Sequence, residues 1–242
     1  MSTYAELEKD LKLNANPEKV VVLKRFFKTG PGGYGEGDSF LGIIVPTQRE
    51  IAKKYRDLKL TDLQKLIKSK IHEARLVAVF ILVHQYKKAP AEDKKKLVDF
   101  YLKNKAYMNN WDLVDSSAHL ITGDYLLKAY PGYDTKMLFT LAKSESVWDR
   151  RIAVLSSLAF IRKGKFEITL QLAQLLMNDE HDLMHKAVGW MLKEIGKRDE
   201  SVLEGFLDEY AAVMPRTMLR YCIEKLPEKK RKFYLSAKSR SL

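Results

Sequence analysis

The chain has 242 residues, and 46% of them are hydrophobic, which is enough to bury a substantial core. The formal net charge is +12, with Lys and Arg spread along the chain. This excess favours a polyanionic partner, nucleic acid first and an acidic membrane surface second, with an incidentally basic protein as the alternative. Cys222 is the single cysteine, which excludes an internal disulfide and a cluster of cysteine metal ligands.

The amino terminus lacks the basic, apolar and small-residue pattern of a secretion signal. No apolar stretch is long enough to span a bilayer, so we expect no membrane partner. The single cysteine also fits a reducing compartment. The expected location is therefore the cytoplasm.

Helical periodicity runs through almost the whole chain, and strand signals are almost absent. Asn16-Pro17 is typical of a helix start, because Asn caps the first turn and Pro fits the first helical position. In the first half of the chain, the predicted helices cover residues 3–12, 16–28, 47–56, a short segment capped by Thr61-Asp62, 72–87 and 90–104.

Residues 29–38 interrupt this pattern and hold five of the twelve glycines. No Gly-Lys-Ser/Thr ending follows, which argues against a nucleotide P-loop. The segment is either a mobile loop that places Tyr34 near a ligand or a plain connector. Residues 40–45 form a short apolar run with no neighbouring strand to pair with, so we interpret them as a buried connector.

A repeat becomes visible from His72 onward. Helices of similar character begin near His72, Trp111, Trp148 and Met184, at intervals of 39, 37 and 36 residues. Each is followed by a second predicted helix, over 90–104, 132–143, 166–177 and 201–211. This period predicts an all-α, HEAT-like solenoid, an α-α superhelix with a concave basic groove. We expect one domain over 1–242 with a basic segment at 228–242; an ordinary helical bundle is the alternative.

Trp111 and Asp115 are four residues apart, so on a helix they project from one face. A carboxylate beside an indole is unusual on a packing surface, because a buried charge needs a partner. We set Asp112 apart as an ordinary acidic residue of a helix start. A solvated or Arg-paired surface acid is the alternative for Asp115.

Aromatic and cationic residues alternate on the next two repeats. The predicted helix over 147–163 begins with Trp148, Arg150 and Arg151, and the one after it carries Lys186, Trp190 and Lys193 on one face. Such a surface is typical of proteins that bind a nucleic-acid backbone. For each tryptophan taken alone, packing in the core is the alternative.

A carboxylate in the middle of a phosphate-binding surface repels the phosphates of the ligand. This unfavourable charge suggests that Asp115 has a catalytic role. Breaking an N-glycosidic bond builds positive charge on the deoxyribose, and a fixed carboxylate would stabilise that state and orient a water molecule. His181 and His185 have the spacing of metal ligands but no evident third ligand, so we expect neither a metal nor another cofactor.

Four segments resemble the signature sequences of the AlkD-like DNA alkylation repair family, whose members are HEAT-like repeat DNA glycosylases. They follow the family's order and lie within residues 16–225. They are FLGI at 40–43 with Pro46 and Arg49, NWDLVD at 110–115, VWDRR at 147–151 and KAVGW at 186–190. Phe26 stands where well-known members carry a tyrosine, so one hydroxyl contact to DNA is expected to be missing.

The resemblance implies a monofunctional glycosylase that releases cationic alkylpurines, such as N3-methyladenine and N7-methylguanine, from duplex DNA while the base stays stacked. It implies that Asp115 is the catalytic carboxylate, that Trp111 and Trp190 flank the deoxyribose, and that Arg151 holds a phosphate. Further expected DNA contacts are Phe26, Lys28, Trp148, Arg150, Lys186 and Lys193.

We therefore expect a monomeric base-excision-repair enzyme at the bacterial or archaeal nucleoid, with alkylated double-stranded DNA as its partner. Two alternatives share the scaffold. One is a non-catalytic binder of DNA or branched DNA, and the other is a HEAT-type protein-interaction module. Salt-sensitive DNA binding would exclude the module, and base release would separate the enzyme from the binder.

Overall fold

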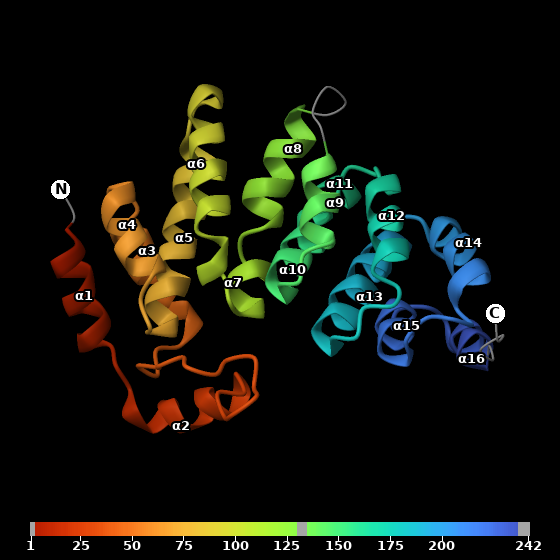
Figure 1. Cartoon of the computed structure of the whole chain (residues 1–242), viewed down its shortest axis with the longest axis horizontal. Helices are drawn as coiled ribbons and strands as arrows, with labels where there is room; N and C mark the ends of the chain where they lie inside the picture. The colour runs from red at the N-terminus through yellow and green to blue at the C-terminus, as the bar shows by residue number, and fades with distance from the viewer. Residues whose placement is uncertain (1–2, 130–134, 237–242) are drawn as a thin grey trace. The chain divides into compact units, whose positions relative to one another are not determined.

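The structure, a computed structural model, describes residues 3–129 and 135–236. Within these ranges it consists of helices and their connections, and the β-type contact recorded there is an isolated bridge between Ser39 and Ile71. The prediction of an all-α chain is confirmed (Figure 1). Contacts divide the chain into two compact units, Met1–Ile121 and Thr122–Leu242. The expectation of one domain over residues 1–242 stays a prediction.

The first unit is organised around one long buried helix, α5. Its helices are α1 (Tyr4–Leu13), α2 (Pro17–Phe26), α3 (Val45–Lys54), α4 (Leu60–Ile67), α5 (His72–Lys88), α6 (Ala91–Lys103), the short turn η1 (Lys105–Tyr107) and α7 (Trp111–Asp115). Thirteen of the 17 residues of α5 are buried, and the helix packs against α3 and α4 (Figure 1). A helix that is apolar on every side needs neighbours on every side, which explains its central position.

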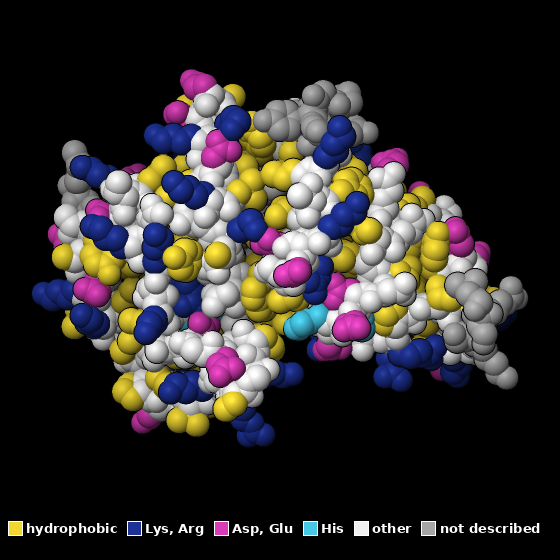
Figure 2. Space-filling view, viewed as in Figure 1, with side chains coloured by type: hydrophobic (Ala, Val, Ile, Leu, Met, Phe, Trp, Pro, Cys, Tyr) yellow, Lys and Arg dark blue, Asp and Glu magenta, His cyan; other side chains and the backbone are white. Residues whose placement is uncertain are grey.

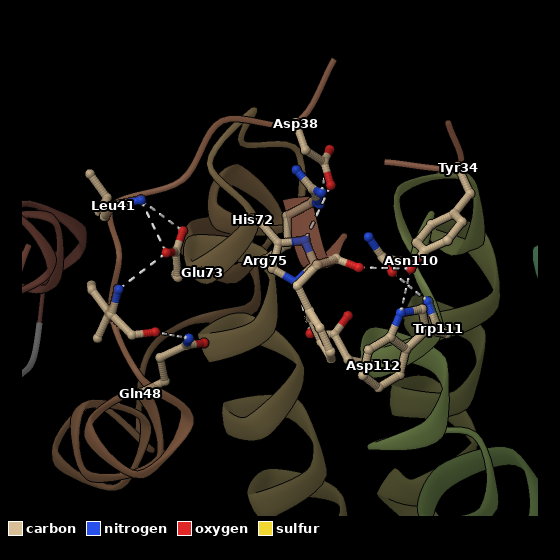
Figure 3. Close-up of polar contacts among 12 residues, drawn as sticks. Tyr34, Asp38, Leu41, Gln48, His72, Glu73, Arg75, Asn110, Trp111 and Asp112 are labelled. Carbon is tan, nitrogen blue, oxygen red and sulfur yellow. Dashed lines mark hydrogen bonds and ion pairs between the residues drawn. The ribbon is translucent and has the colours of Figure 1, made fainter. Parts of the chain in front are cut away.

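The connector between α2 and α3 is held by a buried carboxylate. Glu73 of α5 is fully buried, and its side chain accepts backbone N–H bonds from Leu41 at 3.0 Å, Gly42 at 2.8 Å and Ile43 at 3.2 Å (Figure 3). Gly42 has a φ of +84°, and a Cβ there would lie 1.9 Å from the Asn16 carbonyl oxygen. The interpretation of residues 40–45 as a buried connector is therefore correct for Phe40, Gly42 and Ile43, but Ile44 and Val45 are exposed and Val45 already begins α3.

The glycine-rich segment folds back onto the end of α2. Lys28 ends the helical region with a φ of +51°, and its carbonyl accepts a bond from the Gly35 N–H. A Cβ on Gly33 would lie 1.8 Å from the Lys28 carbonyl oxygen, so this turn requires glycine. The loop therefore has a defined path against α2.

The second unit continues the pattern of short paired helices. Its elements after the π-helical turn η2 (His119–Gly123), which spans the division, are α8 (Asp124–Ala129), α9 (Lys136–Ala142), α10 (Val147–Ser156), α11 (Leu158–Ile161), α12 (Glu167–Leu175), α13 (Asp182–Gly196), α14 (Glu200–Tyr210), α15 (Arg216–Cys222) and α16 (Glu228–Ser236). Helix α13 packs against α14 and α15, and α10 packs against α9 and α13. The helix starts predicted near Trp111, Trp148 and Met184 lie within two residues of observed starts.

Three local predictions are wrong or incomplete. Thr61-Asp62 does not cap α4, which begins at Leu60 after Lys59 without a side-chain cap. The helix predicted over 147–163 is divided into α10 and α11, where the Ser156 and Ser157 hydroxyls bond backbone carbonyls of the preceding turn. Part of the helix predicted over 132–143 and the end of the basic segment lie outside the described residues.

The described part of the basic carboxyl-terminal segment is a helix docked on α14. Tyr234 donates to Asp208 at 3.0 Å, and Lys230 pairs with Glu200 and Glu204. Among the residues that the structure describes, no helix is long and apolar enough to cross a membrane.

Candidate functional site

Asp115 ends a five-residue helix that begins at Trp111. The Asn110 side chain accepts a hydrogen bond from the Trp111 N–H at 2.8 Å, which fixes the start of α7. Trp111 and Asp115 both line one cavity of the first unit. The prediction that their spacing puts them on one face is confirmed.

That cavity has a volume of about 450 Å³ and is mostly apolar. We call it the aromatic cavity, because its walls include Phe26, Phe27, Phe40, Phe80 and Trp111, with Asp115 beside them. The Phe27 ring stacks against Trp111 at 5.5 Å and against Phe40 at 5.3 Å between centroids. Packed rings give the cavity a rigid flat wall.

A second hollow of about 460 Å³ also has Asp115 in its lining. We call it the cationic cleft, because Arg49, Lys53 and Lys87 line it together with two histidines. The Arg49 guanidinium lies 4.1 Å from the centre of the Phe80 ring. Phe80, Asp115 and Ser116 belong to both hollows, so the carboxylate stands where an apolar site meets a cationic one.

The glycine-rich loop brings Tyr34 to Trp111. The Tyr34 hydroxyl donates to the Phe26 carbonyl at 3.2 Å and accepts from the Trp111 indole N–H at 3.3 Å. Lys28 lies 5.8 Å from the centre of the Tyr34 ring, and the half-exposed Phe26 ring meets Trp111 edge-on at 5.7 Å. Two expected DNA contacts, Phe26 and Lys28, thus lie beside the predicted catalytic tryptophan.

A buried network of charged side chains lies beside these rings (Figure 3). His72 contacts Asp38 through Nδ1 at 3.2 Å and Asp112 through Nε2 at 2.8 Å. Arg75 pairs with the other oxygen of Asp38 at 2.7 Å. All four side chains are buried. The negative charges of the two carboxylates and the positive charges of the two cations therefore compensate each other in a region without solvent. The network links the loop, α5 and α7.

The network holds His72 in its charged form. Burial by itself lowers the pKa of His72, but the hydrogen bonds to Asp112 and Asp38 outweigh it and raise that pKa to about 9. Burial by itself raises the pKa of Asp38, yet the hydrogen bond from His72 and the charge of Arg75 bring it below its usual value. Both ring nitrogens of His72 therefore donate at neutral pH.

Sequence reasoning missed this network, and Asp112 is more than an acidic residue of a helix start. A signal was present, since His72, Glu73 and Arg75 are the polar residues at the start of a helix that is otherwise strongly apolar. Polar groups in such a place need buried partners. Their partners lie more than 30 residues away, at Asp38, Leu41 and Asp112, so helical spacing does not reveal them.

The network predicts a loss of stability in mild alkali. His72 has a folded-state pKa of about 9 against an ordinary 6.5, so its contribution is complete below pH 6.5 and is lost as the pH rises through 9. We expect the free energy of unfolding, measured with urea, to fall by at most about 3 kcal/mol over that window. His72→Phe should abolish this dependence, and His84→Phe on the same helix should retain it. An equal slope in His72→Phe would contradict the assignment.

The other predicted site residues lie in the second unit. Arg150 pairs with Asp179 at 2.6 Å and donates to the Glu145 carbonyl at 2.8 Å. Arg151 is only 5% exposed and donates to the Leu183 carbonyl at 2.7 Å, which joins α10 to α13. The half-buried Trp148 stands in the first turn of α10.

The cations around Trp190 each have an acidic partner. Lys186 pairs with Asp182 at 2.6 Å, and Lys193 pairs with Glu224 at 2.7 Å. Trp190 itself is half-buried and hydrogen-bonds Glu194, one turn further along α13. On the face drawn in Figure 2, Lys and Arg side chains likewise alternate with acidic ones in each unit. The role of these residues in DNA binding stays a prediction.

The two histidines with metal-ligand spacing have structural contacts. His181 accepts the Leu183 N–H at 3.1 Å as the N-cap of α13, and His185 bonds the Asp179 carbonyl. Within residues 3–129 and 135–236, no three His, Cys, Asp or Glu side chains gather as a metal ion would require.

Fold and site together define an all-α, HEAT-like helical protein with a carboxylate between an aromatic cavity and a cationic cleft. The family described as "DNA alkylation repair enzyme" matches residues 7–226, which is most of the chain. The chain therefore belongs to the DNA alkylation repair enzyme family.

A solved structure has the same fold. It is described as a predicted DNA alkylation repair enzyme from Enterococcus faecalis, with a TM-score of 0.69 and 20% sequence identity. The similarity covers 89% of this chain and 98% of that one. A comparison with curated proteins gives no match.

Proposed function

We propose that this member of the family is an alkylpurine-DNA glycosylase that acts on N3- and N7-alkylated purines in duplex DNA. One observation carries the proposal: Asp115 lines both the aromatic cavity and the cationic cleft. Aromatic rings can pack against a sugar, and cationic side chains can bind the phosphate beside it. A carboxylate between an aromatic and a cationic surface is therefore well placed for the sugar.

The chemistry needs little more than such a carboxylate. An alkylated purine already carries a positive charge, so it leaves as a neutral base with the electrons of the glycosidic bond. The sugar is left as an oxocarbenium-like cation, which the Asp115 carboxylate stabilises. A water molecule oriented by the same carboxylate adds to C1′ and loses a proton. The products are the free base and an abasic site.

The remaining site residues take roles around this centre. Trp111 is held by Tyr34 and by the stacked Phe27, which makes it a rigid wall for the deoxyribose. The family resemblance assigns Trp190 to the deoxyribose and Arg151 to a phosphate. Arg49, with Lys53 and Lys87, gives the cationic cleft its phosphate-binding character.

Release of free base tests the proposal directly. The wild-type protein should release N3-methyladenine or N7-methylguanine from methylated duplex DNA under single-turnover conditions and leave abasic sites. DNA binding without base release would instead indicate the non-catalytic binder. Absence of salt-sensitive DNA binding would indicate the protein-interaction module.

A single substitution in the cationic cleft tests its contact with phosphate. Arg49→Ala should weaken duplex binding and reduce the slope of log K against log salt by about one. Arg56→Ala is the control, because Arg56 lies in the same unit but does not line the cleft. Fluorescence anisotropy over a series of salt concentrations measures both quantities. Equal slopes in the two variants would remove Arg49 from the DNA contact.

A further inference from the structure

At its last two helices, α15 and α16, the charges of the second unit separate instead of alternating. Figure 2 shows acidic side chains over α14 and a group of Lys and Arg side chains at the edge over α15 and α16. We call the exposed cations of these two helices the cationic edge; they are Arg216, Arg220, Lys229, Arg231 and Lys232. Like charges gathered on one surface repel each other, so a polyanion that binds there is favoured.

A stripe of acids on α14 determines which side of α16 faces solvent. Glu200, Glu204 and Asp208 follow each other at four-residue spacing, so they lie on one side of α14. Lys230 pairs with both glutamates, and the Tyr234 hydroxyl donates to Asp208 at 3.0 Å. Lys230 and Tyr234 are also four residues apart, so these contacts use one side of α16. The remaining cations of this helix are therefore exposed.

These exposed cations are poorly neutralised. Lys232 pairs with Glu228 at 2.7 Å, but the two side chains are 76% and 74% exposed, so solvent screens the pair. The other four members of the cationic edge have no acidic partner within the described part of the chain. On the neighbouring α13, by contrast, Lys186 and Lys193 each pair with an acid. The cationic edge therefore keeps its positive charge available.

Helices α15 and α16 present their cations beside each other. The Arg216 guanidinium donates to the Leu235 carbonyl at 2.9 Å, which holds the start of α15 against the end of α16. Arg220 follows one turn later on the same side of α15. The cations of the two helices therefore belong to one surface.

We propose that the cationic edge is a further DNA-binding surface, which contacts the phosphates of undamaged duplex DNA without regard to sequence. Lys and Arg side chains supply most of the affinity for non-specific DNA, because they release counterions from the phosphates. The Phe233 ring of α16 is 66% exposed and can pack against a sugar of the same backbone. Such a surface goes beyond the proposed function, because it takes no part in breaking the glycosidic bond.

The observations favour duplex DNA over an acidic membrane as the partner. The chain belongs to a family of DNA alkylation repair enzymes, and DNA is a polyanion. A helix that lies on a membrane needs a continuous apolar side. In α16, all of which the structure describes, Phe233 is the single large apolar side chain that is exposed. The surface is therefore suited to phosphates rather than to acyl chains.

Binding to an undamaged duplex at several salt concentrations tests the cationic edge. The triple substitution Lys229→Ala, Arg231→Ala and Lys232→Ala leaves Lys230 and Tyr234 in place, so α16 should stay docked on α14. At about 100 mM salt, the variant should bind at least about tenfold more weakly than the wild type. Its slope of log K against log salt should fall by about two to three, since each phosphate contact contributes about 0.9. Fluorescence anisotropy measures both quantities.

The control removes the same charge from the first unit. Lys95, Lys96 and Lys103 are exposed on α6, and replacing all three with alanine should reduce the slope by less than about one. Lys229→Arg combined with Lys232→Arg keeps the charge and should bind as the wild type does.

Equal slopes in the two triple variants would overturn the proposal. A triple variant of α16 that keeps its affinity for the duplex, but no longer binds vesicles of phosphatidylserine and phosphatidylcholine, would also overturn it and indicate a membrane partner. Binding to an undamaged duplex requires no base release, so these outcomes do not depend on the proposed glycosylase activity.

Discussion

Asp115→Asn is expected to reduce single-turnover release of alkylpurine by at least about 100-fold, the usual cost of removing one preorganised electrostatic group from a transition state. The substitution keeps the size of the side chain and removes only its charge, so the sugar cation loses its counter-ion and the water its acceptor. Duplex affinity should stay equal or rise slightly, because one negative charge near the phosphates is gone.

The appropriate control is a carboxylate elsewhere in the same unit. Asp57→Asn removes a charge from an 84% exposed side chain that lines neither the aromatic cavity nor the cationic cleft. It should release base at the wild-type rate. A clear loss of DNA binding in Asp115→Asn, or a rate equal to that of Asp57→Asn, would show that Asp115 does not act on the transition state.

Glu73→Ala is expected to have the largest effect on stability. The carboxylate accepts bonds from three consecutive backbone N–H groups, and its removal leaves these donors buried without partners. Each unsatisfied donor costs on the order of 1–3 kcal/mol, so we expect the free energy of unfolding to fall by roughly 3–5 kcal/mol in total. Urea denaturation with the m-value as a check measures this loss.

Two variants locate the cause of that loss. Glu73→Gln keeps one oxygen acceptor and should retain part of the stability, since the carbonyl can still bind the N–H groups of the connector. Glu50→Ala removes a 76% exposed carboxylate and should change stability by less than about 0.5 kcal/mol. If Glu73→Ala behaves like Glu50→Ala, the carboxylate does not hold the connector.

The contacts of Glu73 also affect the candidate functional site. The connector that it holds continues from Phe40 and leads into Val45, and both residues line the aromatic cavity. The His72 network contacts α7 through Asp112, and Tyr34 of the glycine-rich loop hydrogen-bonds Trp111. The cavity is therefore built from four separate segments that meet through buried polar contacts and through aromatic ring contacts.

The helical architecture and the central pair of the site were accessible from the sequence. Helix starts follow from local chemistry, such as Asn16 before Pro17, and the i, i+4 spacing places Trp111 and Asp115 on one face. These features depend on neighbours within one turn. One local pattern failed where a competing local bond intervened, at Ser156 and Ser157, and the cap predicted at Thr61-Asp62 is also wrong.

Only the tertiary structure decided which polar residues meet. The partners of His72 are Asp38 and Asp112, 34 and 40 residues away, and Lys193 meets Glu224 across 31 residues. No helical period encodes such distances, because these contacts form when separate helices pack and must satisfy their buried charges. The sequence by itself therefore determined the helices, the Trp111–Asp115 pair and the family. Packing decided that this pair borders a mostly apolar cavity of about 450 Å³.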